Sequence, residues 1–115
     1  MKSTLKLTTS SLEKDHQIVQ FDGDFDTAGF NDVKPDLDKI ILNFKGKNLI
    51  FDFTKLQFIN SSGIGYLMEV HAHLIKGGRT LVIVGSNDHV KDVFDAVGIA
   101  EIVKFYDKLD DFLKI

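Results

Sequence analysis

The stretch from residue 48 to residue 76 constrains the fold most strongly, because a buried strand runs almost directly into a long helix. NLIFDF, at residues 48–53, is apolar enough to be covered on both faces of a sheet. From Ser62 onward the apolar residues recur at helical spacing, as Ile64, Leu67, Met68, Ala72, Leu74 and Ile75. Gly77 and Gly78 then end the predicted helix at Lys76. A strand joined to an amphipathic helix in this way is typical of an α/β protein.

Four other segments have the pattern of strands. Apolar and polar residues alternate in residues 4–12 and again in residues 16–23, which predicts two strands joined by a turn around Glu13, Lys14 and Asp15. Residues 80–85, TLVIVG, repeat the dense apolar pattern of a buried strand. Residues 101–107 are a weaker strand, expected near an edge of the sheet.

Three more helices are expected between and after these strands. The first is predicted over 35–44, with Pro35 in its first turn, where the missing N–H is harmless, and with a looser turn over 27–33. The second covers the apolar positions from Val90 to Val97, is capped by Asn87 or Asp88, and stops at Gly98. A short C-terminal helix is expected around Leu109, Phe112 and Leu113.

The resulting order is β-β-α-β-α-β-α-β-α. Strands that alternate with helices after an opening hairpin predict a mixed sheet with helices packed on it. With 115 residues and no linker, repeat or low-complexity tract, the chain is expected to form one α/β domain over residues 1–115. We expect a mixed sheet of four to five strands flanked by about four helices.

Composition removes several classes of function. The formal net charge of −3 argues against nucleic-acid binding, which requires a basic face. The chain has no cysteine, so disulfides, thiol catalysis and thiolate metal sites are excluded. No apolar run reaches the length of a membrane span, and the N-terminus lacks the apolar core of a signal peptide. We therefore expect a cytoplasmic protein that does not insert into the membrane.

Metal and catalytic patterns are weak. Asp22, Asp24 and Asp26 begin like a calcium loop, but Thr27 and Val33 stand where that loop needs Gly and Glu. The pair His71 and His73 is spaced so that the two rings point in different directions on a helix. The serines near residue 61 lack the Gly-x-Ser-x-Gly elbow of a hydrolase. No metal, no cofactor and no enzymatic activity are expected.

The polar residues at the strand–helix joint carry more information. Asn60, Ser61 and Ser62 are all good N-cap residues, and Gly63 allows close packing of the helix. A helix needs only one N-cap residue, so capping alone does not explain why two serines follow Asn60. A phosphate on a serine at a helix N-terminus would meet free N–H groups and the positive end of the helix dipole. The joint is therefore suited to a charge switch.

At these residues the chain resembles the STAS domain family, the anti-sigma-factor antagonists and their relatives. The family pattern is a buried strand followed by Asp-Ser-Ser-Gly-hydrophobic-Gly at a helix start, and here the segment is LIFDFTKLQFINSSGIGYLMEV. The segment VQFDGDFDTA is similar to the family loop after the second strand. Residues 78–107 are similar to its closing strand, helix and strand. The resemblance thus extends over nearly the whole chain.

The resemblance implies a function as well as a fold. Members of this family bind a partner, classically a serine kinase that doubles as an anti-sigma factor. Phosphorylation of the first serine of the motif, Ser61 here, breaks that binding, and a PP2C-like metal-dependent phosphatase restores it. Asp26 falls where the family has an acid close to the site, and Thr27, Ser62 and Gly63 are its expected neighbours.

One residue of the motif departs from the family pattern and affects the implied phosphorylation at Ser61. The family's acid before the phosphorylated serine is Asn60 here, which keeps the capping ability but loses a negative charge. Kinase recognition could differ as a result.

A second set of residues on the predicted helix suggests where a partner binds. The set consists of Tyr66, Val70 and His73, which recur at helical spacing on the side of the helix away from the predicted apolar stripe. We expect them to form part of the partner surface, the alternative being ordinary packing under a neighbouring loop.

Three functions are weighed. The first is a non-catalytic partner-switching regulator controlled at Ser61. The second keeps the fold without the switch, as a constitutive subunit of a transport or stress-signalling assembly, with Asn60 as a sign of relaxed kinase chemistry. The third is an enzyme or nucleotide binder, for which the sequence offers no convergent acid, base and nucleophile.

Overall fold

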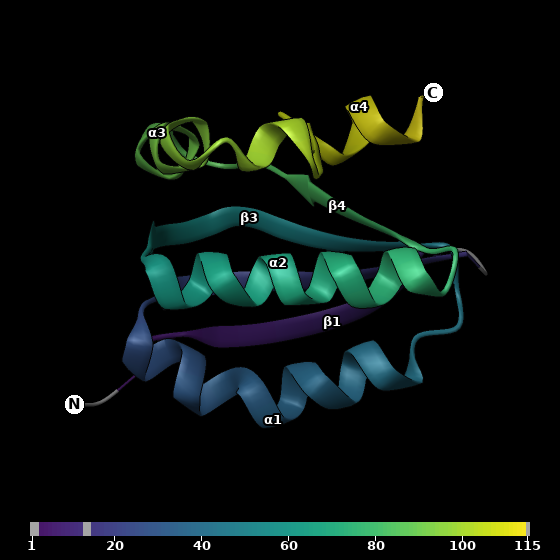
Figure 1. The fold of residues 1–115 in the computed structure, drawn as a ribbon, viewed down its shortest axis with the longest axis horizontal. Coiled ribbons are helices and arrows are strands. Elements are labelled where there is room, and N and C mark those ends of the chain that lie inside the picture. Colours follow the sequence, from purple (N-terminus) through teal and green to yellow (C-terminus); the bar gives the residue numbers. More distant parts are fainter. Residues whose placement is uncertain (1–2, 13–14, 115) are drawn as a thin grey trace.

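The computed structural model describes residues 3–12 and 15–114, so Glu13 and Lys14 of the predicted turn lie outside the described residues. Within these ranges the chain forms five strands, four α-helices and one 3₁₀ turn (Figure 1). The strands are β1 (Lys6–Leu12), β2 (His16–Phe25), β3 (Asn48–Ile59), β4 (Thr80–Val84) and β5 (Lys104–Tyr106). The helical elements are α1 (Thr27–Asn43), α2 (Ser61–Lys76), α3 (Asp88–Val97), η1 (Ile99–Glu101) and α4 (Leu109–Leu113).

The strands form one mixed sheet in the order β1-β2-β3-β4-β5. β1 is antiparallel to β2, whereas β2, β3, β4 and β5 are parallel to one another. Each parallel step needs a crossover, and α1, α2 and α3 supply the three crossovers in turn. The predicted mixed sheet with flanking helices is confirmed.

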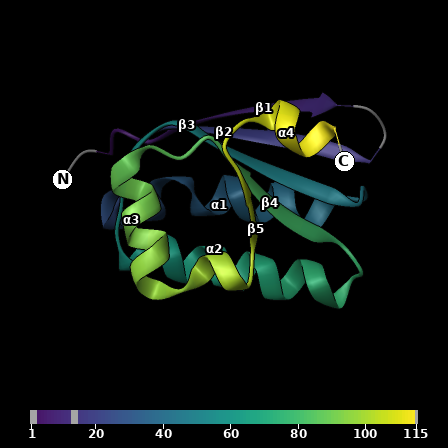
Figure 2. The ribbon, with the colours of Figure 1, turned by 90° about the horizontal axis from the view of Figure 1, so that it is seen from above.

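The two faces of the sheet are covered differently. One face carries the main core, which packs against α1, α2 and α3; its strand residues include Val19, Phe21, Leu49, Phe51, Phe53, Leu81 and Ile83. The other face is covered by α4, which lies on the side of the sheet away from α2 (Figure 2). There Phe112 packs on a smaller cluster formed by Ile50, Val82 and Val84.

α1 begins eight residues earlier than predicted, at Thr27 rather than Pro35. Asp26 caps this early start, since its carboxylate accepts a hydrogen bond of 2.8 Å from the Gly29 N–H. Pro35 therefore lies inside the helix, where a proline costs about 3 kcal/mol. Its ring is exposed, and burial of the opposite face holds the helix together through Val33, Leu37 and Ile41. The proposed first turn at Pro35 was wrong because packing outweighs the local preference of proline.

β3 is longer than the predicted segment 48–53 and continues to Ile59. Its extension pairs with the end of β2, past register shifts at Gln20/Asp22 and Gly23/Asp24. Gly23 has a positive φ of 119°, and a side chain there would collide with the Thr4 carbonyl, so only glycine suits this position. The extension brings the end of β3 directly to the start of α2.

α2 is rotated relative to the predicted apolar stripe. Ala72 is exposed and Ile75 is 53% exposed, although both were placed in the stripe. The face that packs on the core is instead formed by Gly63, Tyr66, Leu67, Val70 and Leu74. A hydrophobic pattern does not count Gly63, although it belongs to this packed face, because glycine has no side chain.

The C-terminal elements follow the predictions closely. Asn87 is the N-cap of α3, and its side chain accepts a hydrogen bond of 2.8 Å from the Val90 N–H. Gly98, in the left-handed region with φ of 73°, ends the helix as predicted. Glu101 belongs to η1 rather than to β5, so the edge strand is shorter than expected. No helix within residues 3–12 and 15–114 is long and apolar enough to cross a lipid bilayer.

Candidate functional site

The ends of β2 and β3 bring the predicted site together. Phe25 and Ile59 are in register as the last residues of these parallel strands, and the Asn60 N–H donates to the Phe25 carbonyl at 3.2 Å. α1 and α2 both begin here, and in Figure 1 their N-terminal ends lie at the same end of the sheet. Two segments more than thirty residues apart in the sequence, around Asp26 and around Ser61, are thereby placed side by side.

Asn60 is the N-cap of α2. Its side-chain oxygen accepts hydrogen bonds from the backbone N–H groups of Ser62 at 3.0 Å and Gly63 at 3.4 Å. These two N–H groups would otherwise lack partners at the first turn of the helix. The capping role expected of one of the three polar residues therefore belongs to Asn60, and both serines lie inside the helix.

The two serines have different surroundings. Ser61 is exposed, and within the described residues no hydrogen bond to its hydroxyl is found. Ser62 is half-buried, and its hydroxyl lies 3.2 Å from the hydroxyl of the exposed Thr27 at the start of α1. The Asn60 side-chain N–H donates to the same Thr27 oxygen at 3.4 Å. The hydroxyl that faces solvent at this helix start is that of Ser61.

The two glycines of the joint also differ. A methyl group added at Gly63 would lie 2.8 Å from Ile59 Cγ1 and 2.9 Å from the Phe25 carbonyl oxygen, both too close for van der Waals contact. At Gly65, which is exposed, an added methyl group would meet no heavy atom of the described residues within 4 Å. Packing inside the domain therefore requires glycine at position 63 and not at position 65.

The predicted exposure of Tyr66 and Val70 is wrong, because their side chains are 4% and 2% exposed; His73 is exposed as expected. Tyr66 and Val70 lie on the side of α2 that faces α1, a helix whose true extent the sequence pattern did not indicate. All three residues nevertheless line one groove of about 210 Å³ between the two helices. Its other lining residues are Asp38, Ile41, Leu42 and Glu69.

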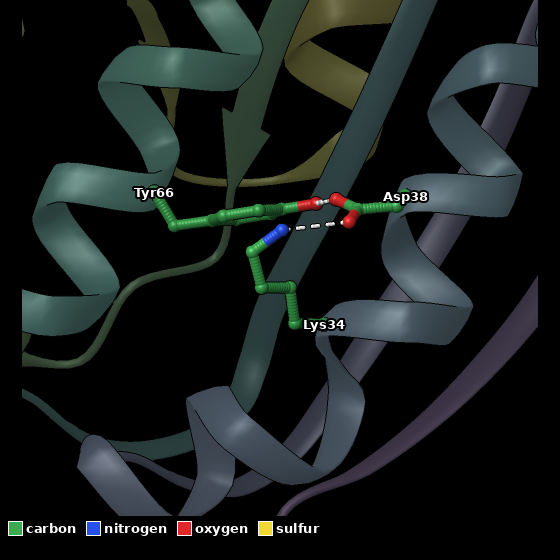
Figure 3. Close-up of polar contacts among 3 residues, drawn as sticks. All are labelled: Lys34, Asp38 and Tyr66. Carbon is green, nitrogen blue, oxygen red and sulfur yellow. Dashed lines mark hydrogen bonds and ion pairs between the residues drawn. The ribbon is translucent and has the colours of Figure 1, made fainter.

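A polar contact joins α1 to α2 beside this groove (Figure 3). The Tyr66 hydroxyl donates to one oxygen of Asp38 at 2.6 Å, and the Lys34 ammonium donates to the other oxygen at 2.7 Å. Lys34 also lies 5.9 Å from the centre of the Tyr66 ring. The spacing of Lys34 and Asp38 on one helix could have suggested their pairing. The sequence gives no signal that Tyr66 contacts Lys34 and Asp38.

Hydrogen bonding and burial shift the pKa of each residue in this contact. The hydrogen bond with Lys34, and after it the one with Tyr66, lowers the pKa of Asp38. The hydrogen bond with Asp38 raises the pKa of Lys34. Burial, and then the hydrogen bond with Asp38, raises the pKa of the Tyr66 phenol. At neutral pH the contact therefore consists of a carboxylate, an ammonium and a protonated phenol.

The lowered pKa of Asp38 predicts an acid-dependent loss of stability. The folded state releases this proton more readily than the unfolded state, so the stabilisation is present above the ordinary carboxyl pKa of 3.8 and disappears as the pH falls below it. Asp38→Asn should therefore flatten the fall of Tm between roughly pH 6 and pH 2.5, measured by circular dichroism. Asp36→Asn, at an exposed position of the same helix, is the control and should keep the wild-type profile. Superimposable profiles for wild type and Asp38→Asn would contradict the role of Asp38.

The acidic loop does not gather into a metal site. Asp26 is committed to capping α1, and Asp22 is exposed. Over residues 3–12 and 15–114, no group of three or more His, Asp or Glu side chains is placed to hold a metal ion. Asp22 and Asp24 lie within β2.

Fold and site together define the class of protein. The family model of the STAS domain matches residues 10–112, and the chain belongs to the STAS domain family. Among curated proteins, the anti-sigma F factor antagonist of Paenibacillus polymyxa is 24% identical over 90 residues, which cover 78% of this chain and 77% of that protein.

Solved structures agree on the fold. An anti-sigma factor antagonist from Mycobacterium paratuberculosis superimposes with a TM-score of 0.85 at 16% identity, covering 99% of this chain and 97% of that one. The Bacillus cell fate determinant SpoIIAA in its phosphorylated form gives a TM-score of 0.70 at 14% identity, covering 95% and 98%. The chain therefore has the SpoIIAA-like STAS fold.

Proposed function

We propose that this protein is a non-catalytic partner-switching regulator of the anti-sigma-factor-antagonist type, acting in the cytoplasm. With Ser61 unmodified, it binds a serine kinase of the anti-sigma type. Phosphorylation of Ser61 releases the partner, and a PP2C-like metal-dependent phosphatase restores binding. The observation that carries this proposal is the position of Ser61, an exposed hydroxyl in the first turn of α2 in a STAS domain.

The local physics favours a switch that acts on binding rather than on folding. A phosphate adds close to two negative charges at neutral pH. At Ser61 it would project into solvent beside the positive end of the α2 dipole, so the isolated domain should tolerate it. A partner docked over the same hydroxyl would have to bury those charges, which would weaken binding strongly.

The partner surface is proposed to follow α2 away from Ser61. Ser61, Gly65, Glu69 and His73 are all exposed and recur every four residues, so they form one ridge along the helix. The ridge borders the groove lined by Tyr66 and Val70. A helix-interior glycine costs about 0.5–1 kcal/mol relative to alanine, and packing does not explain it at position 65. Its small size would instead let the partner backbone approach closely.

The test is a set of paired baits from the native cell. We expect Ser61→Ala to retain the kinase-type partner and Ser61→Asp to lose it, with Ser62→Ala behaving like wild type. Mass spectrometry of the wild-type protein from the same cells should find phosphate on Ser61. If wild type, Ser61→Ala and Ser61→Asp all retain the same partner, the switch is wrong. The alternative function, a constitutive subunit of a transport or stress-signalling assembly, would then be favoured. The neutral Asn60 in place of the family's acid is consistent with that alternative.

A further inference from the structure

Thr27 distinguishes the two adjacent serines at the start of α2. It is the first residue of α1, and its hydroxyl oxygen lies 3.2 Å from the Ser62 hydroxyl. The same oxygen accepts a hydrogen bond of 3.4 Å from the Asn60 side-chain N–H. Ser61, one residue before Ser62, is exposed, and the hydrogen bonds of this cluster do not include its hydroxyl.

The hydrogens of this cluster can be assigned from donor chemistry. The Asn60 amide nitrogen only donates, so the Thr27 oxygen is the acceptor in that contact. Thr27 keeps its own hydrogen and a second lone pair, and both can serve Ser62. Whichever hydroxyl donates, the Ser62 side chain is held toward α1. A carboxylate at position 60 could not donate a hydrogen bond to Thr27. It would instead accept one from the Thr27 hydroxyl, which could then no longer donate to Ser62.

We propose that Thr27 is a positioning residue that selects Ser61 rather than Ser62 as the phosphoryl acceptor. This inference rests on the proposed phosphorylation switch. In that step a serine oxygen attacks the γ-phosphorus of ATP, the bond from that phosphorus to the ADP oxygen breaks, and the hydroxyl proton passes to a base on the kinase. The Ser62 hydroxyl would first have to leave Thr27 and turn outward, whereas the Ser61 hydroxyl already faces solvent.

Side-chain rotamers test the holding role without any partner. In the free protein, three-bond Hα–Hβ couplings measured by NMR should show one rotamer for Ser62 and averaged rotamers for Ser61. Thr27→Val keeps the shape but lacks the hydroxyl, so the Ser62 couplings should become averaged while those of Ser61 stay unchanged. Thr27→Ser should restore the single rotamer. Averaged Ser62 couplings in wild type, or unchanged couplings in Thr27→Val, would overturn the inference.

The site of modification tests the selection itself. Each variant is incubated with MgATP and a purified anti-sigma-type kinase from the same organism, and phosphate is located by fragmentation mass spectrometry. The Ser62-to-Ser61 phosphate ratio should rise about two- to tenfold in Thr27→Val, the range of one ordinary hydrogen bond, and return in Thr27→Ser. An unchanged ratio with Ser61 still modified would overturn the inference alone. Phosphate on neither serine of wild type would overturn the proposed switch and, with it, this selection, while the NMR couplings still decide whether Thr27 holds Ser62.

Discussion

Replacing Val70 by Glu is expected to unfold the domain. The Val70 side chain is 2% exposed and belongs to the main apolar core, so the new carboxylate would have to be buried among apolar side chains. The expected loss is about 4 kcal/mol or more, a large part of the 5–15 kcal/mol that usually stabilises a domain. Circular dichroism and urea denaturation should show loss of the cooperative transition at neutral pH.

Ala72→Glu is the matched control for this prediction. It introduces the same side chain two residues further along α2, at an exposed position, and should change the free energy of unfolding by no more than about 0.5 kcal/mol. A Val70→Glu protein with wild-type stability would mean that this face of α2 is open to solvent. Val70 would then belong to the exposed partner surface that the sequence pattern predicts.

The two glycines of the joint should respond to alanine in opposite directions. Gly63→Ala forces a methyl group against Ile59 and the Phe25 carbonyl, and the backbone there is fixed by the hydrogen bond from Asn60. We expect a loss of about 1–3 kcal/mol. Gly65→Ala, in open space, should gain about 0.5–1 kcal/mol from helix propensity.

Both alanine variants can be measured on the same purified domain. Thermal unfolding should place Tm of Gly63→Ala below that of wild type and Tm of Gly65→Ala above it, with roughly 4 °C for each kcal/mol. The order is the diagnostic result, because the two substitutions are chemically identical and lie on the same helix. A stabilised Gly63→Ala would contradict the close packing of α2 on β2. A destabilised Gly65→Ala would show that position 65 is not in open space.

The periodic parts of the fold were predictable, and the parts set by contacts between distant segments were not. The dense apolar runs of β3 and β4 and the cap and stop of α3 at Asn87 and Gly98 follow from local chemistry. The start of α1 depends on Asp26, and its helix tolerates Pro35 because the opposite face is buried. Such compensation is a tertiary effect that a local pattern does not contain.

The candidate site shows the same division. The motif at residues 60–63 was visible in the sequence, and the structure assigns the N-cap to Asn60 and the first helical position to Ser61, the proposed phosphorylation site. The contact with Thr27 and the burial of Tyr66 depend on how α1 lies beside α2, so they emerge only from the folded chain. The groove residues were grouped correctly on one helix face, while their solvent exposure was misjudged.

The strand order β1-β2-β3-β4-β5 has a consequence for how the chain is made. Every strand pairs with the strand synthesised just before it, so no strand emerging from the ribosome waits for a distant partner still to be translated. The sheet can grow by one strand at a time, and from β2 onward each strand is followed by a helix. α4 follows β5 in the sequence, so its Phe112 can cover Ile50 and Val82 on the opposite face only after the strands of the sheet have been synthesised.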